Sequence, residues 1–272
     1  MKISIIIPVF ARTSKDYIKL CLESIHKYSK EKHEIIVCVN PALNIEGYED
    51  LSATYIIASD VQGQWHANNL MARKASNEWI MLIDDDTVLP LNWEEIFEHL
   101  DSDLVCMNCM EPDWTHRGIA PPFVHYDCGK NPQEFNWDEF EKKSMELREE
   151  KMEQGYSYPF LFKKSLWEKV GGWNEEMDPW GSNGDSDFQH LVNLAGVTPM
   201  RWRGVLAYHF SMQSGTFTLP EADPYLARNR RLFEQKWGIV RAGSPEIWYN
   251  KLNLPNPNLR FRPSWMDPKF NV

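Results

Sequence analysis

The sequence predicts an α/β protein built on a Rossmann-like, mostly parallel sheet that is flanked by helices. Three observations favour this class: short runs that are apolar on both faces, an amphipathic segment between the first two runs, and carboxylates directly after a later run. The chain has 272 residues, which is long enough for one large domain with a sizeable core.

The first three elements predict a βαβ unit. Ile3–Val9 is rich in β-branched residues and is typical of a buried parallel strand. Lys15–Lys30 repeats apolar residues at steps of three and four, which predicts a helix. Glu34–Val39 is a second buried strand, and strand, helix and strand at this spacing form a right-handed crossover.

The next segment leads to an acidic triplet. Tyr55–Ala58 is a short apolar strand, the loop at Gly63 leads into a helix over Ala67–Ala75, and Trp79–Ile83 is a fourth buried strand. Asp84-Asp85-Asp86 follows this strand at once. Ligands of open α/β sheets bind beyond the carboxyl ends of the strands, so we expect the triplet to face a crevice.

The second half is less regular. We expect a strand within 101–110, a loop over 111–133 and a helical segment over 134–154. After these we expect a strand over 160–163, a helix over 164–170 closed by two glycines, a helix over 185–195 and a final strand over 205–210. We expect a surface-wrapping tail after residue 253, because that stretch is rich in proline.

Composition excludes several classes. A formal net charge of −10 argues against broad binding to nucleic acid, which needs a basic face. The sequence contains neither a secretory signal nor an apolar run of about 18 residues that could span a bilayer, which leaves at most a peripheral membrane contact. The five cysteines have no framework spacing, and we expect reduced thiols in a cytoplasmic protein.

The acidic triplet carries the strongest chemical signal. Three adjacent carboxylates repel one another at the end of a buried strand, and a divalent cation with oxygen ligands would relieve this repulsion. Mg²⁺ or Mn²⁺ takes one or two carboxylates and leaves its other positions to water and phosphate. A solvated acidic turn is the alternative, and the triplet alone does not decide between the two.

Two further candidates follow in the second half. Asp185 and Asp187 stand at the start of a predicted helix, where one could be a cap while the other deprotonates an acceptor hydroxyl. His209 lies on the last predicted strand and could be a third metal ligand, although a single histidine on a strand is more often structural.

These motifs together resemble the family 2 glycosyltransferases of GT-A fold. The resemblance lies in the opening strand with its Pro-Val-Phe-Ala-Arg loop, the block from Gly63 to Thr87 that ends in a D-x-D motif, the Gly-Gly-Trp to Asp187 block, and the segment 229–238. It implies one catalytic domain over residues 1–240, with a nucleotide-sugar half over 1–110 and an acceptor half over 111–240. Residues 241–272 would be a surface extension.

The resemblance also implies roles for single residues. Asp86 would be a direct metal ligand, Asp84 would share the ion or lie near the ribose, and His209 would complete the metal site. Asp185 would be the general base of an inverting displacement, with Asp187 shaping the acceptor site. The remaining implied contacts are Pro8, Phe10, Arg12, Asn40, Asn69 and Asp85 at the nucleotide-sugar donor, and Trp180 at the acceptor.

Two positions depart from the family pattern. Asn40 stands where the family has an aspartate that reads the base, although its amide oxygen could still accept from uracil, so a UDP-sugar is the expected donor. Gly184 stands where a glutamate usually precedes the catalytic aspartate. The expected activity is transfer of a hexosyl or deoxyhexosyl group to a hydroxyl of a glycan or another acceptor. The stretch 211–218 is a candidate for a lid that closes over the bound substrates.

Three other functions compete. A sugar nucleotidyltransferase would need a glycine-rich basic loop after the first strand, and a metallohydrolase would need more histidine ligands than this sequence offers. A non-catalytic carbohydrate-binding protein would suit the 12 tryptophans but gives no reason for the aspartates.

Overall fold

The computed structural model describes residues 1–10, 14–40, 48–59, 63–112, 123–179, 182–211 and 223–237. Within them a ten-stranded sheet has the strand order β3-β2-β1-β4-β9-β6-β10-β5, with β7 beside β6 and β8 beside β10. The strands are β1 (Ser4–Phe10), β2 (Glu34–Asn40), β3 (Tyr55–Ala58), β4 (Trp79–Leu82), β5 (Thr87–Val88), β6 (Leu104–Glu111), β7 (Val124–His125), β8 (Met152–Gln154), β9 (Phe160–Lys163) and β10 (Met200–His209).

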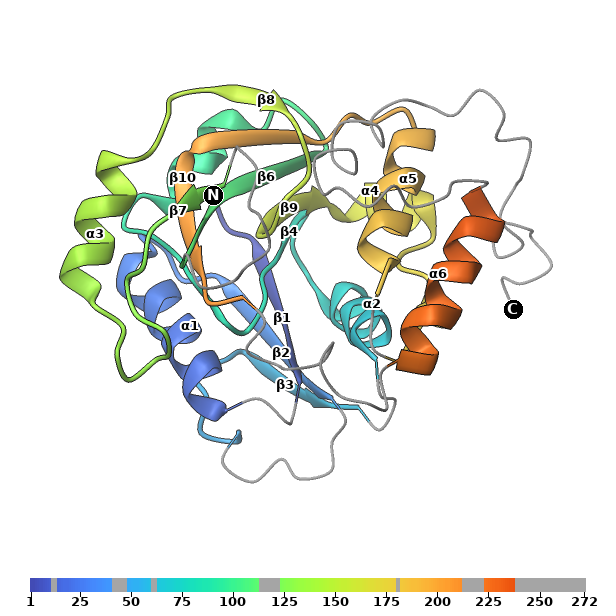
Figure 1. Ribbon diagram of the computed structural model, residues 1–272, viewed down its shortest axis with the longest axis horizontal. Helices are drawn as coiled ribbons and strands as arrows, with labels where there is room; N and C mark the ends of the chain where they lie inside the picture. Colours follow the sequence, from blue (N-terminus) through green and yellow to red (C-terminus); the bar gives the residue numbers. More distant parts are fainter. Residues whose placement is uncertain are drawn as a thin grey trace.

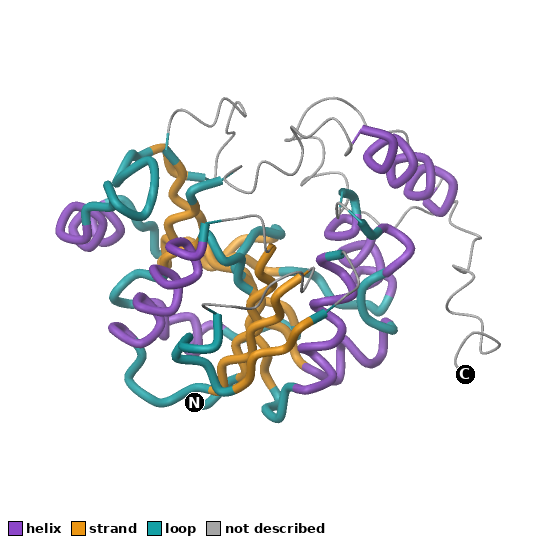
Figure 2. Tube along the Cα trace, turned by 90° about the horizontal axis from the view of Figure 1, so that it is seen from below, coloured by secondary structure: helices purple, strands orange, loops and turns teal. Residues whose placement is uncertain are grey.

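Helices cover both faces of the sheet (Figures 1 and 2). Figure 1 shows α1 and α3 on one side, and α2, α4, α5 and α6 on the other. The helices are α1 (Lys15–Tyr28), α2 (Gln64–Lys74), α3 (Trp137–Glu146), α4 (Lys164–Val170), α5 (Gly184–Leu194) and α6 (Asp223–Trp237), with 3₁₀ segments at Trp93–His99 and Glu175–Met177.

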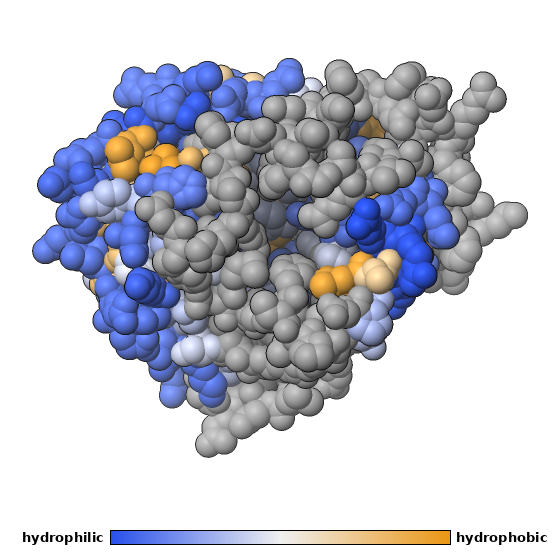
Figure 3. Space-filling model, in the orientation of Figure 1, coloured by the Kyte–Doolittle hydropathy of each residue, from blue (hydrophilic) through white to orange (hydrophobic). Residues whose placement is uncertain are grey.

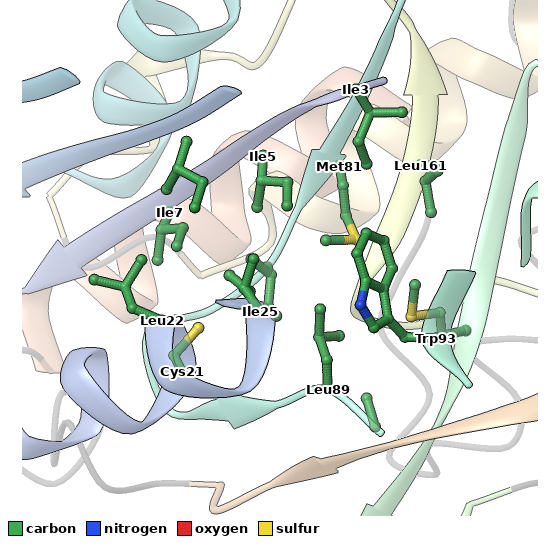
Figure 4. Close-up of a cluster of buried hydrophobic side chains, with 14 of the residues drawn as sticks. Ile3, Ile5, Ile7, Cys21, Leu22, Ile25, Met81, Leu89, Trp93 and Leu161 are labelled. Carbon is green, nitrogen blue, oxygen red and sulfur yellow. The ribbon is translucent and has the colours of Figure 1, made fainter. Parts of the chain in front are cut away.

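The amino-terminal half is parallel, as its apolar strands predict. β1 pairs in parallel with β2 and with β4, and β2 pairs in parallel with β3. Ile5 and Ile7 of β1 face α1, where they pack with Cys21, Leu22 and other buried side chains (Figure 4). Ile6, between them, belongs to the core on the opposite face, so alternate residues of one strand supply both cores.

β9 enters the sheet in the reverse direction. It runs antiparallel to both β4 and β6 and separates them, while β6 and β10 pair in parallel. The carboxyl ends of β1, β4, β6 and β10 therefore meet at one edge of the sheet, and the carboxyl end of β9 does not. Residues Asp84 to Asp86, Glu111 and His209 all follow or end strands at this edge.

Several sequence-based boundaries differ from the structure. The region 134–154 holds helix α3 but ends in strand β8, which pairs antiparallel with β10. β10 begins at Met200, five residues earlier than expected, and its register with β6 shifts between Trp202 and Leu206. That irregularity includes Gly204 and interrupted the apolar pattern that placed the strand start at residue 205.

None of the helices among the described residues is both long and apolar enough to cross a bilayer. The described residues on the face shown in Figure 3 are mostly hydrophilic, with small apolar areas between them.

Candidate active site

The acidic triplet forms a tight turn between two short strands. β4 ends at Leu82, and the Thr87 N–H donates to the Asp84 carbonyl at 3.2 Å to close the turn into β5. β5 pairs antiparallel with the end of β10, so Thr87 lies opposite His209. The Phe210 N–H also donates to the Asp86 carbonyl at 3.1 Å. Backbone pairing between segments more than 120 residues apart thus brings the histidine to the aspartates.

His209 lies between two carboxylates. Its Nε2 is 3.3 Å from Asp86 Oδ1, and its Nδ1 is 2.8 Å from Glu111 Oε1. Burial alone would lower the pKa of His209, but the charge of Asp86 and the hydrogen bonds with both carboxylates raise it well above its usual value. The predicted juxtaposition of Asp86 and His209 is present, and Glu111 is a partner that sequence reasoning missed.

Asp84 faces the amino-terminal end of α2. Gln64 Nε2 donates to Asp84 Oδ1 at 3.4 Å. Burial raises the pKa of Asp84 to about 7, and the charges of Asp86 and Asp185 add to this effect, while His209 opposes it. Asp185 is therefore close enough to Asp84 for its charge to act on that carboxyl.

Asp85 lies on a different side of the turn. The residue is 8% exposed, and its Oδ2 has no hydrogen-bond partner among the described residues. Burial and the charges of Asp86 and Asp84 raise its pKa well above the usual range. Burial raises the pKa of Tyr48, and the charge of Asp85 adds to this shift. Tyr48 belongs to the core that α1 covers.

Asp185 is the second residue of α5 and is half-buried. Asn183, the residue before the helix, has a left-handed backbone with φ of 69°, which turns the chain sharply into α5. Asp185 Oδ1 accepts from the Ser186 N–H at 2.7 Å. The charge of Asp185 acts on Asp84 and also on the buried phenol of Tyr156. Asp185 therefore lies near the turn that follows β4 and near the segment before β9.

The amino terminus of α2 is held by a cap from a distant loop. Asp178 accepts from the Trp65 and His66 N–H groups at 3.3 and 2.9 Å. Asn40, at the end of β2, donates to the Gly63 carbonyl and accepts from the Gly63 N–H, both at 2.9 Å. The amide of Asn40 thus binds protein backbone in this structure, and its predicted contact with the base stays a prediction.

Asn69 connects α2 to the Gly-Gly-Trp segment. Its Oδ1 accepts from the Trp173 N–H and from Trp167 Nε1 at 3.0 and 3.2 Å, and its Nδ2 donates to the Trp173 carbonyl and to Glu175 at 2.9 and 2.8 Å. These four bonds use the whole amide, so the structure gives Asn69 a packing role. Its predicted place near the donor is untested.

Asp187 is fully buried and holds α6. It forms an ion pair with Lys236 at 2.6 Å and accepts from Trp237 Nε1 at 2.7 Å. Burial raises the pKa of Asp187 and lowers that of Lys236, while their mutual attraction opposes both shifts. The structure thus accounts for Asp187 by its contacts with α6, and the predicted acceptor contact remains a prediction.

Other predicted contacts lie partly outside the described residues. Pro8 is buried within β1. Arg12, Trp180, the side chain of Phe10 and all of the candidate lid except Ser211 fall outside the described residues, as does the extension 241–272. In the described residues no three acidic, histidine or cysteine groups already converge on one point that could hold a metal ion.

Three residues of the site were absent from the sequence-based set: Gln64, Glu111 and Asp178. Glu111 carried a weak signal, because it directly follows the apolar run that was expected to end at Met110. Gln64 stood in the expected loop, since the helix begins three residues before the predicted start. The partners of Asp178 are 112 and 113 residues away, and no local pattern indicates them.

Comparison with known proteins gives one family and a set of similar folds. The family described as Glycosyl transferase family 2 matches residues 4–170. The crystal structure of S. aureus TarS 1–349 has a TM-score of 0.52 and 14% sequence identity, and the match covers 91% of this chain and 77% of that chain. The same protein in complex with UDP-GlcNAc matches at a TM-score of 0.52 and 16% identity, again over 91% and 77% of the two chains.

GalNAc-T7 with UDP, GalNAc and Mn²⁺ has a TM-score of 0.53 and 12% identity over 76% of this chain and 42% of that chain. No curated protein sequence matches. At these identities the structural matches confirm the predicted fold class, and the family match confirms the predicted resemblance.

Proposed function

This chain belongs to glycosyl transferase family 2, and from that premise we propose that it transfers a sugar from a UDP-sugar to an acceptor hydroxyl with a divalent cation and inversion at the anomeric carbon. One observation carries the proposal: the acidic turn and His209 meet at the carboxyl edge of the sheet, and Asp185 is near enough for its charge to act on Asp84. A glycosyltransferase role follows from the family, whereas the donor, the cation and the stereochemistry are proposals.

The residues present fit a divalent cation. Asp86 Oδ1 and His209 Nε2 are 3.3 Å apart, and the carboxyl of Asp84 is near enough for Asp86 to raise its pKa. Two carboxylates and one imidazole form a donor set that suits Mn²⁺. The neighbouring carboxyls disfavour one another's charged forms, and Oδ2 of Asp85 has no hydrogen-bond partner among the described residues, so an added positive charge would stabilise the ionised turn.

Asp86, His209 and Asp84 would hold the cation, which when bound would neutralise charge on the leaving diphosphate. Asp185 would accept the proton of the acceptor hydroxyl, because it is only half-buried and lies across from the acidic turn. Attack from the face opposite the diphosphate inverts the anomeric centre. The groups at the starts of α2 and α5 would orient the two substrates for this displacement.

The proposed donor rests on the similar structures. TarS has been crystallised with UDP and with UDP-GlcNAc, and GalNAc-T7 with UDP and Mn²⁺. Residues 4–170, the part that matches the family, include the acidic turn but end before Asp185. The family match therefore does not extend to the residues proposed for the acceptor side, which are Asp185, Asp187 and Trp180.

The five cysteines support a reducing compartment. All five are free and buried. Burial raises the pKa of each described thiol, for example to about 12 for Cys38, which disfavours the reactive thiolate. We place the reaction in the cytoplasm on this ground.

Replacing Asp185 tests the proposed base. Asp185→Asn should reduce transfer by about 10²–10⁴-fold, the usual contribution of general base catalysis. Donor affinity, measured by calorimetry with UDP and Mn²⁺, should stay close to wild type. The matched control is Asp138→Asn, because Asp138 is the second residue of α3 and is exposed. Normal turnover by Asp185→Asn would show that another group removes the proton.

Replacing Asp86 tests the cation. Asp86→Ala should abolish the part of UDP affinity that EDTA removes from the wild type. Asp103→Ala serves as control, since Asp103 pairs with Lys163 at the amino end of β6, away from the turn. A thermal-shift panel of nucleotide-sugars with Mn²⁺ would identify the donor. Undiminished wild-type donor affinity in EDTA would exclude the metal role.

A further inference from the structure

Glu111 and His209 are the last residues of two paired strands. β6 and β10 run in parallel with Met110 opposite Tyr208, so the next position of each strand places Glu111 beside His209. The backbone of Glu111 is fixed by β7, because the Tyr126 N–H donates to its carbonyl at 3.0 Å. The carboxylate is therefore held by the sheet rather than by a flexible loop.

The Glu111 carboxylate binds one particular nitrogen of the imidazole. Its Oε1 is 2.8 Å from Nδ1, while Nε2 lies on the other side of the ring, 3.3 Å from Asp86. The side chains of Glu111 and His209 are 10% and 19% exposed, so water competes little for this bond. A carboxylate that accepts from Nδ1–H fixes the rotation of the ring and leaves Nε2 to point at the acidic turn.

We propose that Glu111 is a positioning residue that orients His209 so that its Nε2 binds a divalent cation together with Asp86. This inference rests on the proposed function, because it assigns the cation to the same site. A cation at Nε2 requires that this nitrogen carries no proton. The proton then stays on Nδ1, because the Nδ1–H donates a hydrogen bond to the Glu111 carboxylate.

A purely structural role for such a pair has a counterpart in the same chain. His33 Nε2 is 3.0 Å from Glu94 Oε1, and these side chains are 1% and 8% exposed. His33 precedes β2, and its Nδ1 accepts from the Ile3 N–H at the amino-terminal edge of the sheet. This second buried pair, at the edge opposite the acidic turn, provides a matched control.

The test compares variants of the two glutamates in the whole chain. Glu111→Met removes the acceptor with little change in volume, Glu111→Gln keeps an amide oxygen that can accept from Nδ1–H, and Glu94→Met is the control. Electron paramagnetic resonance of Mn²⁺ in the presence of UDP measures affinity, and electron spin echo modulation detects an imidazole nitrogen bound to the ion. Thermal unfolding of each variant measures the stability cost.

Glu111→Met should weaken Mn²⁺ binding by about 10- to 100-fold and reduce the nitrogen modulation. Glu111→Gln should keep the nitrogen modulation and lose less affinity. Glu94→Met should lower stability but keep wild-type Mn²⁺ affinity. If Glu111 had only a structural role, Glu111→Met would behave in the same way. Wild-type affinity and modulation in Glu111→Met would overturn the positioning role alone. A wild-type protein that binds no Mn²⁺ with UDP would overturn both this role and the proposed metal dependence.

Discussion

Gly184→Ala should lower the free energy of unfolding, although Gly184 is the first residue of α5 and alanine is the better helix former. An alanine Cβ at this position would lie 2.2 Å from Cε2 and 2.3 Å from Nε1 of Trp65. Trp65 is 2% exposed and packs in the core that also contains Phe188. Either the indole ring or the start of α5 must therefore move.

Two effects of opposite sign decide the outcome. The gain in helix propensity from glycine to alanine is at most about 1 kcal/mol. Overpacking of a filled core costs about 1–3 kcal/mol. Because an approach of 2.2 Å is far inside van der Waals contact, we expect an overpacking cost of about 2–3 kcal/mol, which leaves a net destabilisation of roughly 1–2 kcal/mol. Because Asp185 is the next residue, a displaced helix start should also lower the rate of transfer at saturating substrate.

Urea denaturation in two backgrounds separates the clash from other causes. In a Trp65→Val background the whole indole ring is absent, so Gly184→Ala should cost little or become stabilising. Gly196→Ala is the control, since Gly196 has a φ of +83° and a Cβ there would meet nothing within 4 Å. Its cost should come from the backbone and be equal in both backgrounds. A Gly184→Ala protein that is as stable as wild type would refute the packing argument.

Three further predictions concern buried polar side chains. The pKa of His190 is lowered to about 4 by burial and by the charge of Lys236, so its contribution to stability should fall as the pH drops from about 6.5 to about 4, by up to ~3 kcal/mol. His190→Phe should remove that dependence in urea denaturation at pH 7 and 5, and an unchanged dependence would contradict the shift. Asn229→Ala should cost about 1–3 kcal/mol in the same assay, because the fully buried Asn229 donates to the Met177 carbonyl, and a neutral result would mean that α6 is held elsewhere. Asn68→Leu should instead raise stability by about 1–3 kcal/mol, since the buried amide of Asn68 has no hydrogen-bond partner in the described part of the chain, and a loss of stability would point to a bridging partner.

The sequence predicted those elements whose pattern is local. The bounds of β3, β9 and α4 agree with the structure at both ends, and β1 and β2 agree to within one residue. Strand order was beyond such patterns, because an apolar run of four residues such as β9 fits a parallel or an antiparallel neighbour equally well. The start of α2 was missed for a related reason: its first amides are capped by Asp178, which only the folded chain brings near.

The candidate site divides in the same way. Asp84, Asp86 and Asp185 could be named as candidates because acidic residues at a strand end and at a helix start are visible in sequence. Glu111 was missed, because its meaning depends on the parallel pairing of β6 with β10. Asn69 was assigned to the donor by resemblance alone, and the structure shows an amide fully used by neighbouring segments.

The acidic turn explains why the spacing of its aspartates matters. Asp86 lies beside His209. Asp84 lies beside Gln64, and the charge of Asp185 raises its pKa. The charge of Asp85 instead acts on Tyr48, which lies under α1. The middle residue therefore differs in its surroundings from the two that flank it, as expected where successive side chains alternate in direction after a strand. A cation bound by the outer pair would lie between the histidine and the proposed base. Because Asp85 is buried and its Oδ2 has no hydrogen-bond partner in the part of the chain that the structure describes, a positive charge at the turn would stabilise the charged forms of all three aspartates.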